Sequence, residues 1–148
     1  MAIPELNSEG LLPSGIHSCE LPEIRQRFGS FNGSDRRAEL FARLEQLARA
    51  MQTSKLFAEL LIDGSFVTAK LLPNDVDVIA VLSPNHDFER DMPMSEYALV
   101  SRVLLRRRFG FDVMVAEQNS SLYKTYVEFF SRVRELPDHR KGLLRLAR

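Results

Sequence analysis

The 148-residue chain has no excess of either charge, a single cysteine and no long apolar run. Twenty basic and twenty acidic residues cancel, so no global field draws the chain to a nucleic acid or a membrane. The lone Cys19 excludes an intrachain disulfide and a zinc site built from several cysteines. No stretch approaches the roughly 20 apolar residues that cross a bilayer. Because acidic Glu5 and Glu9 do not fit a signal peptide, we expect a cytoplasmic protein without membrane contact.

The order of apolar patterns predicts one domain of the α/β (α+β) class. A coil with a short helix (1–33) precedes the expected helices at about 35–51, 94–108 and 122–135 and the expected strands at about 56–63, 75–82 and 111–116. The segment 141–148 is either an edge strand or a last helical turn. These elements predict a small mixed sheet of three to four strands covered by helices.

The strongest chemical signal lies in the segment 61–78. An apolar run ends in Gly64 and Ser65, and Asp75 and Asp77 open the next apolar run. Residues two apart on a strand share a face, so both carboxylates project from the same side. Adjacent carboxylates repel each other unless a cation lies between them, and Mg²⁺ binds through one or two carboxylates plus substrate phosphates. The pattern therefore predicts a magnesium site for a phosphorylated ligand.

Other residue types around this pair suit the same ligand. A glycine at a strand end allows a sharp turn and close approach of a ligand, and free N–H groups with the Ser65 hydroxyl would donate to a phosphate. Lys70 could reach a triphosphate as a point charge. Asp112 lies in an apolar, β-branched run, where an unpartnered charge is costly, and a metal ion is its expected partner.

Each of these residues also has a structural interpretation. Asp75 could end a turn, Asp112 could cap the entry to its strand, and Lys70 could be a solvated turn residue. The three histidines lie in expected loops without the spacing of zinc ligands.

Gly-Ser, a nine-residue gap, Asp-x-Asp between apolar residues and a later apolar-Asp-apolar strand together resemble the signature of the DNA polymerase beta-like nucleotidyltransferase superfamily. More narrowly, Asp-Gly-Ser-Phe-Val-Thr-x-Lys at 63–70, with Ile-Pro-x-Leu-Asn at 3–7 and Gly-Leu-Leu-Pro-x-Gly-Ile-His at 10–17, resembles a family of small bacterial nucleotidyltransferase-like proteins. The resemblance implies a minimal nucleotidyltransferase fold whose catalytic core strands lie within 56–116.

The resemblance also implies the roles of individual residues. Asp75, Asp77 and Asp112 would hold two Mg²⁺ ions, and Gly64 and Ser65 would bind the nucleotide phosphates. Two positions depart from the superfamily pattern. Asp63 stands where an apolar residue is usual, and Thr-Ala-Lys at 68–70 replaces an Arg-Gly that many members carry. Lys70 is then the substitute candidate for triphosphate binding.

The implied activity is Mg²⁺-dependent transfer of a nucleoside monophosphate from a triphosphate, with ATP the expected donor, to a hydroxyl of a protein or RNA. Small bacterial relatives suggest a toxin–antitoxin or phage-defence role with a partner protein. Two alternatives remain open. One is a catalytically inactive, antitoxin-like module that binds nucleotide or protein, and the other is a nucleic-acid-binding domain that uses the arginines at 106–108 and the basic C-terminal residues.

Overall fold

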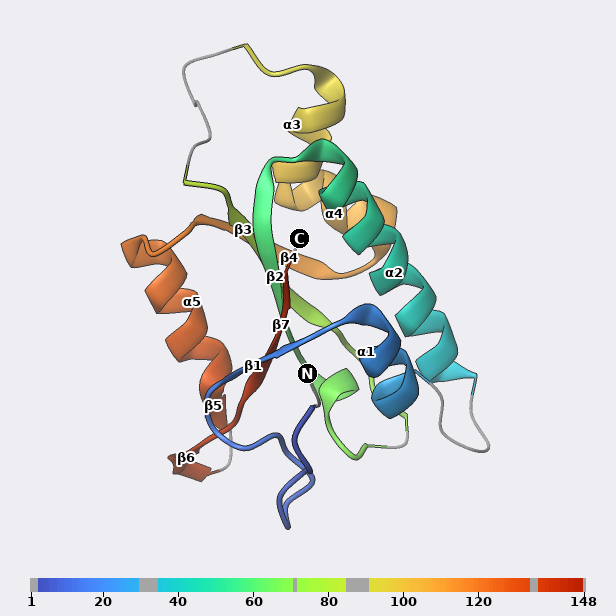
Figure 1. Cartoon of the computed structure of the whole chain (residues 1–148), viewed down its shortest axis with the longest axis vertical. Helices are drawn as coiled ribbons and strands as arrows, with labels where there is room; N and C mark the ends of the chain where they lie inside the picture. The colour runs from blue at the N-terminus through green and yellow to red at the C-terminus, as the bar shows by residue number, and fades with distance from the viewer. Residues whose placement is uncertain (1–2, 30–34, 71, 85–90, 134–135, 148) are drawn as a thin grey trace.

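A five-stranded mixed sheet forms the centre of the molecule, with the strand order β1-β7-β2-β3-β4 (Figure 1). The computed structural model describes residues 3–29, 35–70, 72–84, 91–133 and 136–147. The sheet strands are β1 (Ile16–Cys19), β2 (Phe57–Asp63), β3 (Asp77–Leu82), β4 (Asp112–Glu117) and β7 (Leu143–Ala147), and a second sheet pairs β5 (Arg132–Val133) with β6 (Leu136–Arg140). The expected mixed α+β architecture is confirmed, with β1 and β7 enlarging the sheet.

Helices cover both faces of the sheet (Figure 1). On one face lie α1 (Leu21–Phe28), α2 (Arg36–Ser54), α3 (Met94–Val100) and α4 (Arg102–Phe109), whose apolar side chains join those of the strands in the larger core cluster. The opposite face carries α5 (Ser121–Ser131), which packs on a smaller apolar cluster. Among the helices in the described ranges, none is both long enough and apolar enough to span a bilayer.

The C-terminal strand β7 lies inside the sheet and not at its edge. It pairs in parallel with β1 and antiparallel with β2. The expectation of a strand was right and the expectation of an edge position was wrong, because β1, from the predicted coil, takes the edge. Leu144 and Leu146 are buried in the larger cluster and Leu143 in the smaller one, so the strand is apolar on both faces, as interior strands are.

The helix expected over 94–108 is two helices. Ser101 adopts an extended backbone (φ −90°, ψ 115°) between α3 and α4. Its Oγ accepts a hydrogen bond from the backbone N–H of Leu104 at 3.4 Å, so Ser101 caps the start of α4. The end at Gly110 agrees with the sequence expectation, since this residue has φ +79° in the C-cap position.

Arg37 on α2 does not face solvent. Its side chain is fully buried (0% exposed). The guanidinium donates to the carbonyl oxygens of Phe28 at 3.1 Å, Phe66 at 2.6 Å and Thr68 at 2.8 Å, and also to that of Lys70. Burial lowers its pKa to about 10. One side chain thus ties α1 and α2 to the segment that follows Ser65.

The N-terminal coil is held by local hydrogen bonds, and it reaches the same segment. The Asn7 side chain accepts from the backbone N–H groups of Glu9 and Leu11 at 2.9 and 3.1 Å, which closes a local turn. The backbone N–H of Ala69 donates to the carbonyl of Gly10 at 3.0 Å. The coil therefore packs beside the loop that carries the expected phosphate-binding residues.

Candidate functional site

Three aspartates occupy adjacent positions at one end of the central sheet. Asp63 on β2 is the register partner of Asp77 on β3, and Asp77 is the partner of Asp112 on β4. Each lies two residues from an apolar side chain of the cluster beneath α5, so all three belong to the α5 face of the sheet. The expectation that the third carboxylate stands on a strand next to Asp77 is confirmed.

Gly64 makes the turn that brings the Ser65 segment against the start of β3. Its φ is +91°, a region that side chains disfavour. A Cβ at this position would lie 2.9 Å from the carbonyl oxygen of Asp75 and 3.0 Å from the backbone nitrogen of Asp77. The glycine is therefore required both for the backbone conformation and for the close approach of the Asp75–Asp77 segment. The following turn is the 3₁₀ helix η1 (Ser65–Val67).

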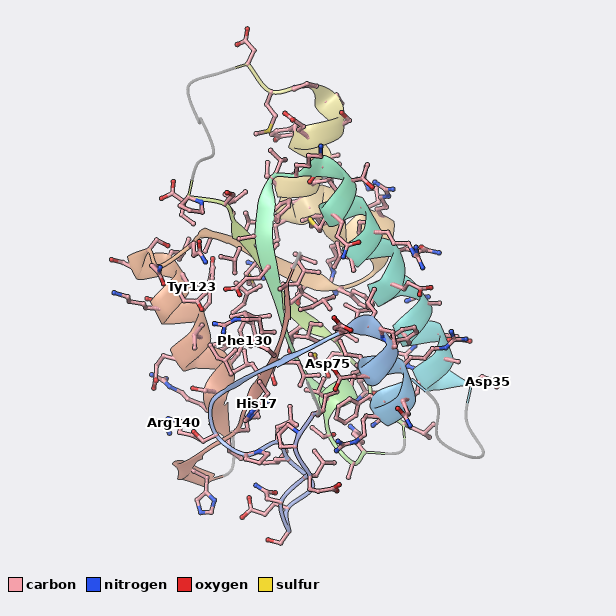
Figure 2. The ribbon with its side chains drawn as sticks, in the orientation of Figure 1. His17, Asp35, Asp75, Tyr123, Phe130 and Arg140 are labelled. Atoms are coloured by element: carbon pink, nitrogen blue, oxygen red, sulfur yellow. The ribbon has the colours of Figure 1, made fainter. Side chains whose placement is uncertain are left out.

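Ser65 holds Asp75 in place through several hydrogen bonds. Its Oγ and backbone N–H both donate to Asp75 Oδ1, at 2.6 and 3.1 Å. The same Oγ accepts from the backbone N–H of Asn74 at 3.0 Å. Burial opposes ionisation of Asp75, but the hydrogen bonds from Ser65 outweigh it, and the pKa of this carboxyl is lowered. Figure 2 shows Asp75 toward the end of the sheet where η1 lies.

The neighbouring Asp77 has the opposite electrostatics. Burial, and then the negative charges of Asp75 and Asp63, raise its pKa to about 7, and Asp112 adds to the shift. Asp63 is almost completely buried, which raises its pKa to about 6, and its Oδ1 has no hydrogen-bond partner among the described residues. The excess of carboxylate charge and the unpartnered buried oxygen fit a divalent cation, which takes oxygen ligands.

Asp112 lies beside this group but engages a helix. Arg106 Nη1 donates to Asp112 Oδ1 at 2.5 Å, and Arg102 Nη2 lies 3.9 Å from the same oxygen. Within the described ranges, no three carboxylate, histidine or cysteine side chains are spaced to hold a metal ion between them. Ligation by all three predicted aspartates would require the Asp112–Arg106 pair to open.

A cavity of about 460 Å³ opens between this end of the sheet and the C-terminal end of α5. It is lined by Leu11, Asp63, Gly64, Ser65, Asp75, Asp77, Phe129, Phe130, Arg132, Val133 and Lys141. Four of the six predicted site residues therefore share one cavity. Asp112 and Lys70 do not line it, and the Lys70 side chain is exposed.

Among the lining residues that were not predicted site residues, Lys141 and Phe129 bear most directly on ligand binding. Lys141 Nζ lies 3.2 Å from Asp63 Oδ2, and Phe129 is 63% exposed at the cavity wall. Asp63 was a sequence signal for the lysine, because a carboxylate that replaces an apolar residue before Gly64 needs a cation. The pattern does not say which cation, since Lys141 reaches the site only through the placement of β7.

His17, His139 and Cys19, which the sequence did not indicate as ligands, do not line the cavity. His17 Nε2 is 2.7 Å from the carbonyl of Pro13, and His139 is an exposed partner of Glu9. His86 lies outside the described residues. Cys19 is buried, and burial raises its pKa to about 12, so its thiol is a poor nucleophile.

The comparisons with known proteins give one family. No curated protein and no solved structure matches the chain. A family model described as a family of unknown function (DUF6932) matches residues 4–147. The match covers the N-terminal coil, the aspartate strands and β7, and the chain therefore belongs to the DUF6932 family.

Proposed function

We propose that this protein is a Mg²⁺-dependent nucleotidyltransferase. It would transfer a nucleoside monophosphate from a triphosphate, with ATP the expected donor, to a hydroxyl of a protein or RNA, and release pyrophosphate. The observation that carries the proposal is the Gly64–Ser65 turn, locked against Asp75 and Asp77 with Asp112 in register beside them. This arrangement is what the superfamily resemblance leads one to expect.

The chain supplies the anionic side of such a site. Ser65 fixes the orientation of Asp75 and keeps it ionised, while Asp77 sits where a second negative charge is unfavourable without a cation. Asp75, Asp77 and Asp112 would hold the metal. When bound, Mg²⁺ would stabilise charge on the phosphate oxygens and lower the pKa of the acceptor hydroxyl.

The cavity wall supports a ligand larger than a phosphate. Phe129 exposes 63% of its surface, and its ring meets that of the buried Phe130 edge-on at 5.4 Å between centroids. Figure 2 shows Phe130 between α5 and the sheet, which anchors this end of the helix. An exposed, supported aromatic ring is a suitable platform for a nucleobase. The fold would then offer a base platform on α5.

One observation favours the alternative of a catalytically inactive, antitoxin-like module. The ion pair of Arg106 with Asp112 already neutralises the third carboxylate. An inactive member would keep this pair closed and use the cavity for binding alone. Because Arg106 is paired with Asp112, it is less available for the nucleic-acid contact considered for the arginines at 106–108.

The deciding experiment is transfer of label from α-³²P-ATP to proteins and RNA of a cell lysate with Mg²⁺. The test variant is Asp75→Asn/Asp77→Asn, and Glu117→Gln, at the opposite end of β4, is the matched control. We expect labelling by the wild type and the control, and its loss in the double variant. Equal labelling by all three proteins, or by none, would leave the binding module as the function. The labelled acceptor would also test a toxin–antitoxin or phage-defence role.

A further inference from the structure

A buried ion pair forms part of the cavity floor. Lys141 Nζ lies 3.2 Å from Asp63 Oδ2, where the Asp63 side chain is 3% exposed and that of Lys141 is 21% exposed. The second oxygen, Asp63 Oδ1, is buried and accepts no hydrogen bond from the part of the chain that the structure describes. The lysine therefore neutralises the carboxylate from one side only, and its ammonium keeps a route to the cavity.

The backbone around Lys141 is fixed from two directions. The N–H of Lys141 donates to the carbonyl of Ser131 at the end of α5, at 2.8 Å, and the N–H of Gly142 donates to the carbonyl of Leu12 at 3.0 Å. A Cβ on Gly142 would lie 2.1 Å from the carbonyl oxygen of Pro13, so only glycine fits there. The lysine thus enters the cavity from a rigid support, which lowers the entropy lost when it binds a ligand.

The position of Lys141 suits an anion better than any other described cation at the cavity. Arg132, the second cation of the wall, has its Nε 3.5 Å from Glu128 on the exposed side of α5. Lys141 instead meets the residue directly before Gly64 and Ser65, where the turn approaches the aspartates. Lys70, the phosphate-binding candidate of the sequence, does not line the cavity.

We propose that Lys141 binds the terminal phosphates of a Mg²⁺-bound polyphosphate chain, and that buried Asp63 holds its ammonium in place for this contact. The proposal rests on the proposed function for the identity of the ligand. It assigns to Lys141 the role for which Lys70 was the sequence candidate, and it explains why an aspartate replaces the usual apolar residue before Gly64. Asp63 is a positioning residue in this arrangement.

The test measures calorimetric binding of inorganic pyrophosphate and of ATP, each with Mg²⁺, to the full chain. Removal of Lys141 alone leaves a buried negative charge and threatens folding, so the key variant is the neutral pair Asp63→Asn/Lys141→Met. A matched control is Glu59→Gln/Arg145→Met, a second ion pair between β2 and β7 whose residues lie outside the cavity, with Arg145 Nε 2.6 Å from Glu59 Oε2. Circular dichroism and thermal unfolding confirm that both double variants are folded.

We expect the Asp63/Lys141 variant to bind pyrophosphate about 10- to 100-fold more weakly than the wild type, while the Glu59/Arg145 variant binds as the wild type does. Equal binding by a folded Asp63/Lys141 variant would show that the pair is only structural, and absence of pyrophosphate binding by the wild type would also overturn the inference. Label transfer is scored separately. If binding depends on Lys141 but the wild type transfers no label, the proposed enzymatic function is refuted and the phosphate site stands. If the wild type transfers label but binding does not depend on Lys141, the enzymatic function stands and the phosphate site is refuted.

Discussion

At the scale of single residues, the least expected feature is an arginine that works as an internal brace. Arg37 contacts four backbone carbonyls, and three of them belong to the segment 66–70. Its guanidinium also lies over the Phe66 ring, 5.6 Å from the centroid. From the amphipathic pattern alone, an arginine is expected on the solvent-exposed face of a helix, so sequence patterns could not have revealed this role. Arg37 thus ties the segment 66–70 to α2, and its neighbour Arg36 donates to the carbonyls of Pro73 and Asn74 at 3.0 Å in the same loop.

We predict that Arg37→Met lowers the free energy of unfolding by about 3 kcal/mol or more, because several buried carbonyls lose their donor. Arg49→Met is the control, since the Arg49 side chain is 70% exposed and its replacement should change stability by at most about 0.5 kcal/mol. Urea denaturation followed by circular dichroism measures both. Equal stability of the two variants would contradict the bracing role.

A second residue prediction concerns Asp77, whose pKa is raised to about 7 by burial and by the neighbouring carboxylates. A raised pKa means that the folded state binds the proton more tightly than the unfolded state. The stabilisation is therefore present below about pH 4 and is lost as the pH rises towards 7. In EDTA at pH 7.5, the free energy of unfolding of Asp77→Asn should exceed that of the wild type by about 1 to 2 kcal/mol, a figure reduced for solvent screening. At pH 4.5 the two proteins should differ little in stability.

Chemical denaturation at a series of pH values, with and without Mg²⁺, measures this difference. Mg²⁺ at pH 7.5 should stabilise the wild type and leave Asp77→Asn nearly unchanged, because a cation relieves the repulsion that the substitution has already removed. A stability difference that stays constant between pH 4.5 and 7.5 would show that Asp77 is not the titrating group.

A third residue prediction concerns Phe129. We expect Phe129→Ala to weaken ATP binding about 5- to 100-fold, the range for loss of one base-stacking contact, and to leave pyrophosphate binding unchanged. Because the side chain is 63% exposed, the unfolding temperature should hardly move. Calorimetry with ATP and with pyrophosphate separates the contribution of the base from that of the phosphates. A similar loss for both ligands would place Phe129 outside the base site.

At the scale of elements, the Gly64 turn joins β2 to η1 and sets the distance to β3. Gly64→Ala should be unfavourable for two reasons. Alanine disfavours the positive φ, and its Cβ would lie 2.9 Å from the Asp75 carbonyl oxygen. We predict lower stability and loss of Mg²⁺-dependent stabilisation together. Gly29→Ala is an informative comparison, since its Cβ would also crowd a backbone, 2.7 Å from the Arg25 carbonyl, but far from the aspartates in the sequence. It should lower thermal stability and keep the Mg²⁺ effect.

Much of the element pattern was predictable because it depends on local sequence. The apolar runs that become β2, β3 and β4, the stop at Gly110 and the turn after Gly64 all express short-range preferences. The break at Ser101 was missed because apolar spacing continues through it, and a serine within a helical pattern is no strong signal. Asp75, Asp77 and Ser65 were found from spacing, whereas Lys141 and Phe129 were not, since only the tertiary arrangement brings β7 and α5 to the same cavity.

At the scale of the whole molecule, opposite charges cancel overall but separate locally. Asp63, Asp75 and Asp77 crowd one end of the sheet, where the total charge of zero has no influence. The overall composition gave no reason to expect a general affinity for polyanions, and it cannot show that acidic side chains gather at one end of the sheet. The site also depends on topology, because β2 ends, and β3 and the more distant β4 begin, at the same end of the sheet.

Because β7 lies in the interior of the sheet, we expect its apolar side chains to contribute to the stability of the whole fold. Leu144 is fully buried (0% exposed), and Leu144→Ala should lower the free energy of unfolding by about 2 to 5 kcal/mol. Leu122→Ala, at a position that is 48% exposed, should cost much less. Denaturation curves of the two variants give the comparison. Similar small losses in both would mean that the last strand is only loosely attached.

The same strand has a consequence for how the protein is made. Among the described strands, β1 pairs only with β7, so residues 16–19 have no partner until residues 143–147 have been synthesised. While the ribosome is still adding the intervening chain, the position between β1 and β2 in the nascent sheet is empty, and the backbone N–H and C=O groups that β7 later pairs are open to other molecules. Lys141 immediately precedes that late insertion, which means that the phosphate-binding chemistry proposed here would switch on only as translation of the last strand is completed.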